Sequence, residues 1–146
     1  MTTLQKNLAN KINIELVGEP IDSRSMDVTV VANGVEVACV ANLIGKHQVE
    51  FFQSYPMVIQ ITVTGKGPND TQVDSDGRIT GDKHVLISNL HISGIPVKTW
   101  MLEKCVVEFD HRNTNYLGTN GTATIHLPKS NAMENHFYLL AMSSSS

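Results

Sequence analysis

The amino-acid sequence predicts an all-β fold, an antiparallel sandwich or barrel. Apolar and polar residues alternate with a period of two along most of the chain, as expected of half-buried strands. About seven to nine such runs follow one another at regular spacing, and Gly, Asn and Pro residues separate them. The 146 residues, of which 41% are hydrophobic, suffice for one domain with a sizeable core.

Local patterns define each predicted strand. In the first, Ile12, Ile14 and Leu16 alternate with polar residues. The next two, at residues 27–32 and 35–40, meet at Asn33-Gly34, a pair that favours a tight hairpin because both turn positions require positive φ. Further strands are expected at residues 49–52, 57–63, 84–92, 105–109 and 123–127, and turns rich in Gly, Asn or Pro separate them.

The two ends of the chain carry weaker patterns. Residues 3–11 and 130–136 are the only segments whose composition allows a helix. The apolar run from Phe137 to Met142 is either a last sandwich strand or, if it is exposed, an interface, because large apolar patches rarely stay in contact with water. The tail from Ser143 to Ser146 is low in complexity and is predicted to be mobile.

Charge and hydropathy argue against several classes of protein. The 11 basic and 14 acidic residues give a net charge of -3 without any Lys/Arg run, which argues against a nucleic-acid surface and a polybasic membrane patch. No apolar run approaches the roughly 18 residues of a transmembrane helix, and the N-terminus lacks the apolar segment of a secretory signal. Cys39 and Cys105 are therefore expected as two buried free thiols rather than as one bridge between facing sheets.

A Gly-rich acidic loop lies between two predicted strands and contains four carboxylates, Asp70, Asp74, Asp76 and Asp82. Calcium suits such a cluster because it accepts about six to eight oxygen ligands in flexible geometry. The D-x-D-G-x-I core of an EF-hand is present, but Gln72 and Lys83 replace the outer ligands and the flanks are strands, which argues against an EF-hand. Two interpretations stay open: a calcium site, or a solvated loop with Asx turns.

Several short motifs follow one another along the chain. They are an alternating strand at residues 11–16, a V-N-G-V-like hairpin at 30–37, Asn69-Asp70 in the acidic loop, the run from Asp82 to Ile87 with the Ser93-Gly94 turn, and an N-G-x-x-x-I pattern at 120–125. Their order resembles that of the calcium-dependent, xylan-binding-type carbohydrate-binding modules. The resemblance covers roughly residues 11–127. Such modules are jelly-roll β-sandwiches, usually attached to secreted polysaccharide hydrolases.

The resemblance implies an antiparallel jelly-roll β-sandwich at residues 11–127, an extended arm at 1–10, and a C-terminal arm or last strand at 128–146. It also implies a calcium ion on Asp70, Asp82 and either Asp74 or Asp76, where the ion would coordinate sugar hydroxyls. Sugar sites usually include exposed aromatic rings, and Tyr55 and Tyr116 are the candidates here. The sequence departs from the family by a longer acidic loop, with residues 73–81 inserted before Asp82, and by the lack of a hydrolase domain.

These features favour a non-catalytic structural or surface component of an oligomeric extracellular particle, above all a phage virion protein of the capsid-decoration or tail type with weak glycan adhesion. Release by lysis would bring such a protein out of the cell without a signal peptide. The expected partners are further copies of the chain, other particle proteins and a cell-surface glycan, but neither nucleic acid nor a membrane. The alternative is a calcium-dependent carbohydrate-binding module of a secreted polysaccharide-degrading enzyme.

No arrangement of residues in the sequence indicates an enzyme. The 6 histidines form no HExxH motif or other close ligand spacing, and there is no G-x-S-x-G elbow. His84 and His91 lie in one predicted strand at an odd separation, so they are expected on opposite faces of the sheet. Trp100 is assigned to packing in the core or between subunits.

Overall fold

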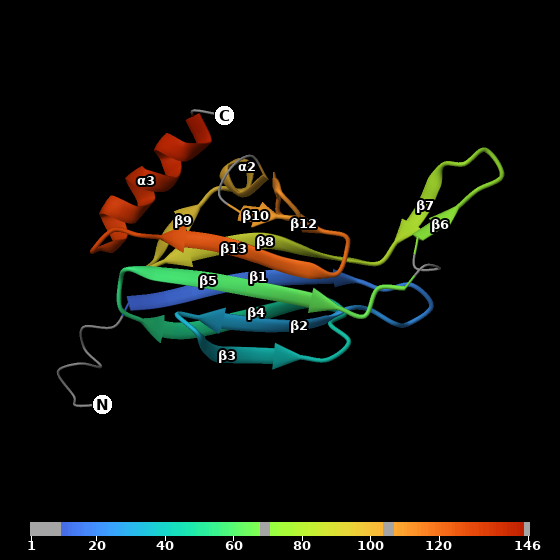
Figure 1. The fold of residues 1–146 in the computed structure, drawn as a ribbon, viewed down its shortest axis with the longest axis horizontal. Helices are drawn as coiled ribbons and strands as arrows, with labels where there is room; N and C mark the ends of the chain where they lie inside the picture. Colours follow the sequence, from blue (N-terminus) through green and yellow to red (C-terminus); the bar gives the residue numbers. More distant parts are fainter. Residues whose placement is uncertain (1–9, 68–70, 104–106, 145–146) are drawn as a thin grey trace.

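The computed structural model, which describes residues 10–67, 71–103 and 107–144, is an antiparallel β-sandwich (Figure 1). One sheet has the order β12-β8-β1-β4 with β9 paired to β8, and the other has the order β11-β10-β13-β5-β2-β3. The first sheet consists of β1 (Asn10–Glu19), β4 (Gly45–Gln53), β8 (His84–Ile92), β9 (Ile95–Val97) and β12 (Tyr116–Leu117). The second consists of β2 (Asp27–Ala32), β3 (Val35–Val40), β5 (Met57–Thr64), β10 (Val107–Phe109), β11 (Arg112–Asn113) and β13 (Gly121–Leu127). The predicted all-β sandwich is confirmed.

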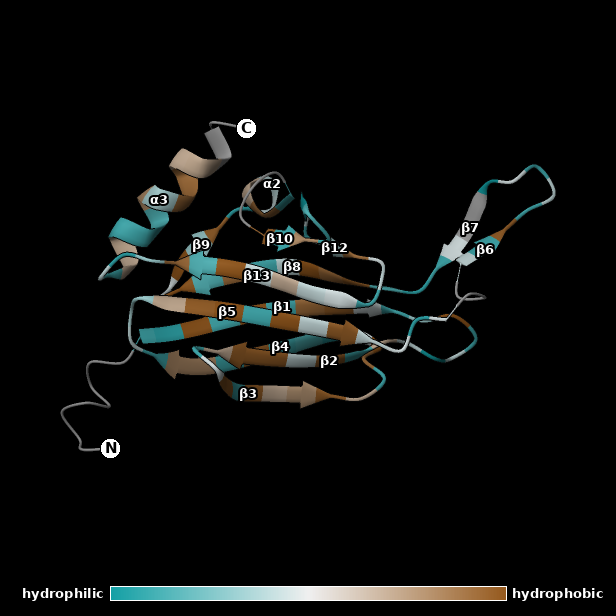
Figure 2. Ribbon diagram, in the orientation of Figure 1, coloured by the Kyte–Doolittle hydropathy of each residue, from teal (hydrophilic) through white to brown (hydrophobic). Residues whose placement is uncertain are grey.

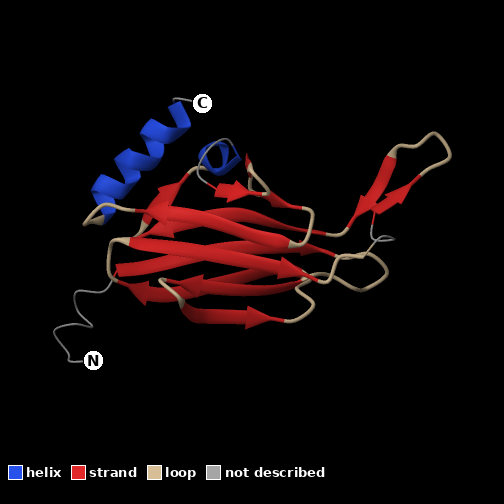
Figure 3. Cartoon of the chain, viewed as in Figure 1, coloured by secondary structure: helices blue, strands red, loops and turns tan. Residues whose placement is uncertain are grey.

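Smaller elements lie outside the two sheets (Figure 3). The hairpin of β6 (Thr71–Val73) and β7 (Ile79–Asp82) projects from one end of the sandwich (Figure 1). The short helical turn α2 (Thr99–Met101) and the helix α3 (Ala132–Ser144) contact each other, and α3 also contacts β9. None of the described helices has the length and apolar character to span a membrane.

The core lies between the sheets and contains every second side chain of the long strands. In β1, Ile12, Ile14 and Leu16 are fully buried, whereas the polar residues between them reach the surface. The same alternation of buried and exposed side chains runs along β5, where Figure 2 shows brown bands separated by one teal and one white band. Because antiparallel sheets of this kind bury one face and leave the other to solvent, the period-two pattern decides which side chains are available for a ligand.

The predicted Asn33-Gly34 hairpin joins β2 to β3. Both residues have positive φ, 48° and 80°, as a tight hairpin turn requires. The Asn33 side chain also accepts a hydrogen bond from the Val58 amide at 2.8 Å and donates one to the Pro56 carbonyl at 3.1 Å. One turn residue therefore fixes both the hairpin and its position beside β5.

The C-terminal segment differs from the predicted arm or last strand, because residues 132–144 form helix α3. Asn131 caps this helix: its side chain accepts a hydrogen bond from the Glu134 amide at 2.9 Å. Asn135 and Leu139, four residues apart, are both buried, whereas Phe137 between them is 61% exposed. That spacing is helical rather than alternating. The predicted N-terminal arm lies outside the described residues, except for Asn10, which begins β1.

The prediction of two buried thiols is wrong for Cys39, which lies on β3 with an exposed, free thiol. Among the described strands β3 is the last of its sheet and pairs with β2 alone. The burial pattern of such an edge strand is weak, so an apolar run there does not imply a buried side chain. Cys105 lies outside the described residues.

Candidate functional site

The outer face of the β12-β8-β1-β4 sheet is polar. Lys11, Asn13 and Glu15 of β1 alternate with buried residues and therefore point away from the core. Their antiparallel partners on β4 are Phe52, Glu50 and Gln48, respectively. Residues directly opposite each other in adjacent strands share one face of the sheet. This face therefore carries ammonium, amide, carboxylate and aromatic groups in neighbouring rows.

A pocket of about 260 Å³ opens on this face and is lined by Lys11, Asn13, His91 and Gly94. His91 is the cross-strand partner of Asn13. Gly94 has a φ of +81° in the β8–β9 turn, and no atom lies within 4 Å of the place where a side chain would start. The Lys11 ammonium forms an ion pair with Glu50 at 3.5 Å. The pocket thus has an open glycine wall and three polar side chains.

An exposed aromatic ring lies beside the pocket. Phe52 is 58% exposed and is the direct cross-strand partner of Lys11. Its neighbour Phe51 is buried, because consecutive strand residues point to opposite faces. Two adjacent phenylalanines in one strand therefore indicate that one of the rings is exposed. The site residues that the sequence did not predict are Phe52, Lys11, Asn13 and His91.

A β-bulge places both strand histidines on this face, so the prediction that His84 and His91 face opposite sides is wrong. The register between β1 and β8 shifts by one residue, because Glu15 pairs with Asn89 whereas Leu16 pairs with Ile87. Ser88 is the extra residue, and its hydroxyl donates to the Glu15 carboxylate at 2.8 Å. The extra residue reverses the alternation of side chains along β8. His84 and His91 are both half-buried and therefore lie on the same, outer face of the sheet.

A second polar cluster surrounds Asp82, at the base of the β6–β7 hairpin. Its Oδ1 atom lies 2.5 Å from the Lys66 ammonium and accepts a hydrogen bond from the Thr71 hydroxyl at 2.7 Å. Its Oδ2 atom accepts a hydrogen bond from the Tyr116 hydroxyl. Lys66 also donates to the Gly118 carbonyl. The structure therefore brings together two residues predicted for the site, Asp82 and Tyr116, and joins them to Lys66, which was not predicted.

The cluster shifts the pKa values of both predicted residues. Burial acts to raise the pKa of Asp82, but the hydrogen bonds from Lys66, Tyr116 and Thr71 and the charge of Lys66 outweigh it, so the pKa is lowered. Burial, followed by the hydrogen bond to Asp82 and its charge, raises the pKa of Tyr116 far above its ordinary value. The carboxylate and the neutral phenol are thus the stable forms.

The Tyr116 ring packs against His84 and Gly118. It stacks on His84 with a centroid distance of 4.3 Å and an interplanar angle of 27°. A side chain on Gly118 would start 2.6 Å from the ring, so the glycine backbone also packs closely against it. The residue is 37% exposed. Its role as a sugar contact stays a prediction, whereas its contacts with Asp82 and His84 are observed.

The other glycan candidate, Tyr55, is half-buried and packs against the core. Its hydroxyl is buried. Burial raises the pKa of this phenol, while the nearby Ser93 side chain acts in the opposite direction. The ring therefore offers less surface to a ligand than Phe52 does.

The remaining acidic residues are separated from Asp82. Asp74 and Asp76 lie in the turn between β6 and β7, and the Asp74 carboxylate accepts hydrogen bonds from the amides of Asp76 at 2.9 Å and Arg78 at 3.0 Å. This is the predicted Asx turn. Residues 79–81 of β7 lie between the turn and Asp82, so roughly 13 Å of strand separates Arg78, at the end of the turn, from Asp82. Asp70 lies outside the described residues.

The described residues do not fit the calcium ion that the resemblance implies. No three His, Cys, Asp or Glu side chains among them form a group that could hold a metal ion. Asp82 is neutralised by an ammonium at 2.5 Å, and both of its oxygens accept hydrogen bonds. Calcium would have to displace Lys66 in order to bind there. The calcium site stays a prediction.

Comparisons with known proteins give similarity at the level of the fold. No family model and no curated protein matches the chain. The selenomethionine form of vCBM60 is similar over 80% of this chain and 90% of that one, with a TM-score of 0.48 and 11% identity. That structure was reported in a study of circular permutation as an evolutionary link between two families of calcium-dependent carbohydrate binding modules. vCBM60 in complex with galactobiose is similar over 80% and 97%, with a TM-score of 0.47 and 14% identity.

Proposed function

We propose that this protein is a non-catalytic carbohydrate-binding protein and that its ligand lies on the outer face of the β12-β8-β1-β4 sheet. The observation that supports this proposal is the pocket of Lys11, Asn13 and His91 beside the exposed ring of Phe52. Ligand sites typically combine an apolar or aromatic surface with a few well-placed polar groups.

The chemistry of these residues suits a sugar. A pyranose presents an apolar C–H face and a rim of hydroxyl groups, each a donor and an acceptor. Phe52 supplies an apolar surface for the C–H face. Asn13 can donate and accept at once, the neutral His91 ring carries one donor and one acceptor, and Lys11 donates only. Both hydroxyl roles therefore have partners within one pocket.

Strand geometry makes this site rigid. Asn13 and His91 lie in the middle of paired strands, and Lys11 is held at the same level because its carbonyl accepts a hydrogen bond from the Ser93 amide at 2.7 Å. Sites built on strands hold their side chains more precisely than sites on loops. The proposed mode does not involve the acidic hairpin, since Lys66 already neutralises Asp82.

The test is a glycan array, followed by calorimetry on the sugars that bind. Phe52→Ala, Asn13→Ala and His91→Ala should each weaken binding by about tenfold or more. Gln60→Ala and His126→Ala are matched controls, because they remove an amide and an imidazole from the outer face of the opposite sheet. Binding that survives all three site substitutions, or that is lost equally in the controls, would refute the sheet-face site.

We also propose an assembly role as a second candidate function. Trp100 on α2 and Met133 and Phe137 on α3 are 46%, 52% and 61% exposed, and the two helical elements contact each other. Exposed apolar groups on neighbouring elements support a protein interface. The predicted place in a virion or another extracellular particle stays a prediction, and detection of the chain in purified particles by mass spectrometry would test it.

A further inference from the structure

Helix α3 buries only one of its sides. Leu139 is 1% exposed and Asn135 is fully buried, and the helix contacts β9 and α2. The opposite side carries Met133 and Phe137, which are exposed and four residues apart. In Figure 1 the helix stands at the margin of the sandwich, with one flank free of other described elements.

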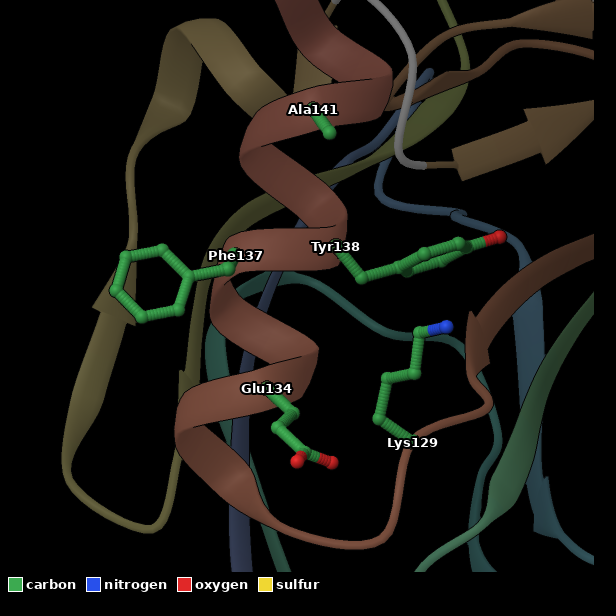
Figure 4. Close-up of a pocket in the computed structure, with 5 residues that line it drawn as sticks. All are labelled: Lys129, Glu134, Phe137, Tyr138 and Ala141. Atoms are coloured by element: carbon green, nitrogen blue, oxygen red, sulfur yellow. The ribbon is translucent and has the colours of Figure 1, made fainter.

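A groove of about 530 Å³ runs along this free flank and is lined by Lys129, Glu134, Phe137, Tyr138 and Ala141. Figure 4 shows Phe137 and Tyr138 pointing to opposite sides of the helix, with Ala141 one turn above them and Glu134 one turn below. The Lys129 ammonium lies 5.6 Å from the centroid of the Tyr138 ring. Phe137 is exposed and Tyr138 is half-buried against the core, so the groove has one open and one partly covered aromatic wall, and the small Ala141 leaves room for another backbone.

The groove is already formed in the isolated chain, because Asn135 ties the helix to the segment before it. Its side-chain oxygen accepts a hydrogen bond from the Lys129 amide at 2.9 Å. Its side-chain nitrogen donates to the carbonyls of Lys129 at 3.2 Å and Asn131 at 2.8 Å. A preformed surface costs less conformational entropy when a partner binds.

Two opposite charges lie on the rim of the groove. Lys129 and Glu134 are both exposed, and neither forms an ion pair with another described residue. The Glu134 carboxylate accepts a hydrogen bond from the Ser130 hydroxyl at 3.1 Å. A partner surface that fits this groove must therefore be apolar in its middle and carry the complementary pair of charges on its rim.

We propose that the occupant of this groove is the same groove of a second copy of the chain. In a two-fold dimer one patch meets itself in reverse order, so Lys129 can face Glu134 of the partner subunit, and Glu134 can face Lys129 of the partner subunit. The aromatic walls then cover each other's apolar surface. The groove of one copy therefore supplies both the apolar surface and the opposite charges that the groove of the second copy requires. This inference rests on the assembly role proposed above and is independent of sugar binding.

Charge reversal tests the dimer directly. The wild-type chain should show, by light scattering and sedimentation at rising concentration, a mass that approaches twice 16.0 kDa. Lys129→Glu alone and Glu134→Lys alone put like charges face to face and should each weaken the dimer by about tenfold or more. The double variant restores opposite charges and should dimerise again. An equimolar mixture of the two single variants should form the mixed dimer.

Lys46→Glu is the matched control, since it reverses an exposed lysine on β4 and should leave the dimer unchanged. Phe137→Asp removes an aromatic wall and should abolish the dimer while the far-ultraviolet spectrum stays the same. The proposal is overturned if the wild type remains a 16.0 kDa monomer at the highest attainable concentration. It is equally overturned if an oligomer forms that the single variants do not weaken, or that the double variant and the mixture fail to restore.

Discussion

Replacing Lys66 by Met should destabilise the fold by removing the cation beside Asp82. Methionine keeps the length of the side chain but leaves the Asp82 carboxylate without an opposite charge and the Gly118 carbonyl without its donor. The two side chains are 13% and 18% exposed, so they are screened less than a surface pair. Breaking a fully buried pair costs about 3–5 kcal/mol, and the remaining exposure reduces this to about 2 kcal/mol.

That loss corresponds to a fall in the thermal midpoint of roughly 4–8 °C, because 1 kcal/mol shifts the midpoint of a domain near this size by about 2–4 °C. Thermal unfolding followed by circular dichroism at pH 7 measures it. Lys46→Met is the matched control, since Lys46 is exposed on β4. Adding Asp82→Asn to Lys66→Met removes the unpaired charge, so the double variant should be more stable than Lys66→Met alone.

The pH dependence of the stability difference between wild type and Lys66→Met tests the same role of Asp82. Because the pKa of Asp82 is lowered in the folded protein, its contribution to stability is present above the unfolded pKa and is lost as the pH falls through the folded value. The difference between wild type and Lys66→Met should therefore be largest at neutral pH and shrink below about pH 4. A midpoint for Lys66→Met within about 1 °C of wild type, or a difference that does not change in acid, would refute this account of Asp82.

Three further outcomes follow from the described contacts. Since Lys66 neutralises Asp82, adding calcium or a chelator should leave the thermal midpoint of the wild type unchanged; a clear rise with calcium, with heat in calorimetry, would instead establish the predicted ion. Gly18→Ala should cost at least about 2 kcal/mol in urea unfolding, because the new Cβ would lie 1.8 Å from the Leu43 carbonyl oxygen; an unchanged urea midpoint would contradict that contact. Asn135→Ala should cost about 2 kcal/mol and reduce helix content by circular dichroism, since its buried side chain ties α3 to Lys129; a full helix signal would show that the tie is dispensable.

The sandwich could be predicted because its evidence is local. Alternation at Ile12, Ile14 and Leu16 records which face of β1 is buried, and neighbouring residues alone suffice to recognise it. The Asn33-Gly34 turn is similar, since its positive φ values are a property of those two residues. Strands and tight turns that depend on neighbouring residues can therefore be predicted from the sequence.

The C-terminal helix was harder to predict, because a continuous apolar run from Phe137 to Met142 has no alternation to separate strand from helix. What decides between them is Asn131, which caps the helix, and Asn135, which is buried against the preceding segment. Both act through hydrogen bonds that a hydrophobicity pattern does not record. The acidic loop likewise contains its own short hairpin, whose β7 strand separates Asp82 from Asp74.

The candidate site depends on contacts between residues that are distant in the sequence. Lys66 follows β5 and Asp82 ends β7, and the two meet at the end of the sandwich where Tyr116 and Gly118 also lie. A carboxylate held by a lysine, a tyrosine and a threonine can stabilise that end of the fold without a metal. The single extra residue at Ser88, in turn, places His91 beside Asn13. One β-bulge therefore places the His91 imidazole on the solvent face of the sheet, and an alternating pattern read from the sequence does not record this.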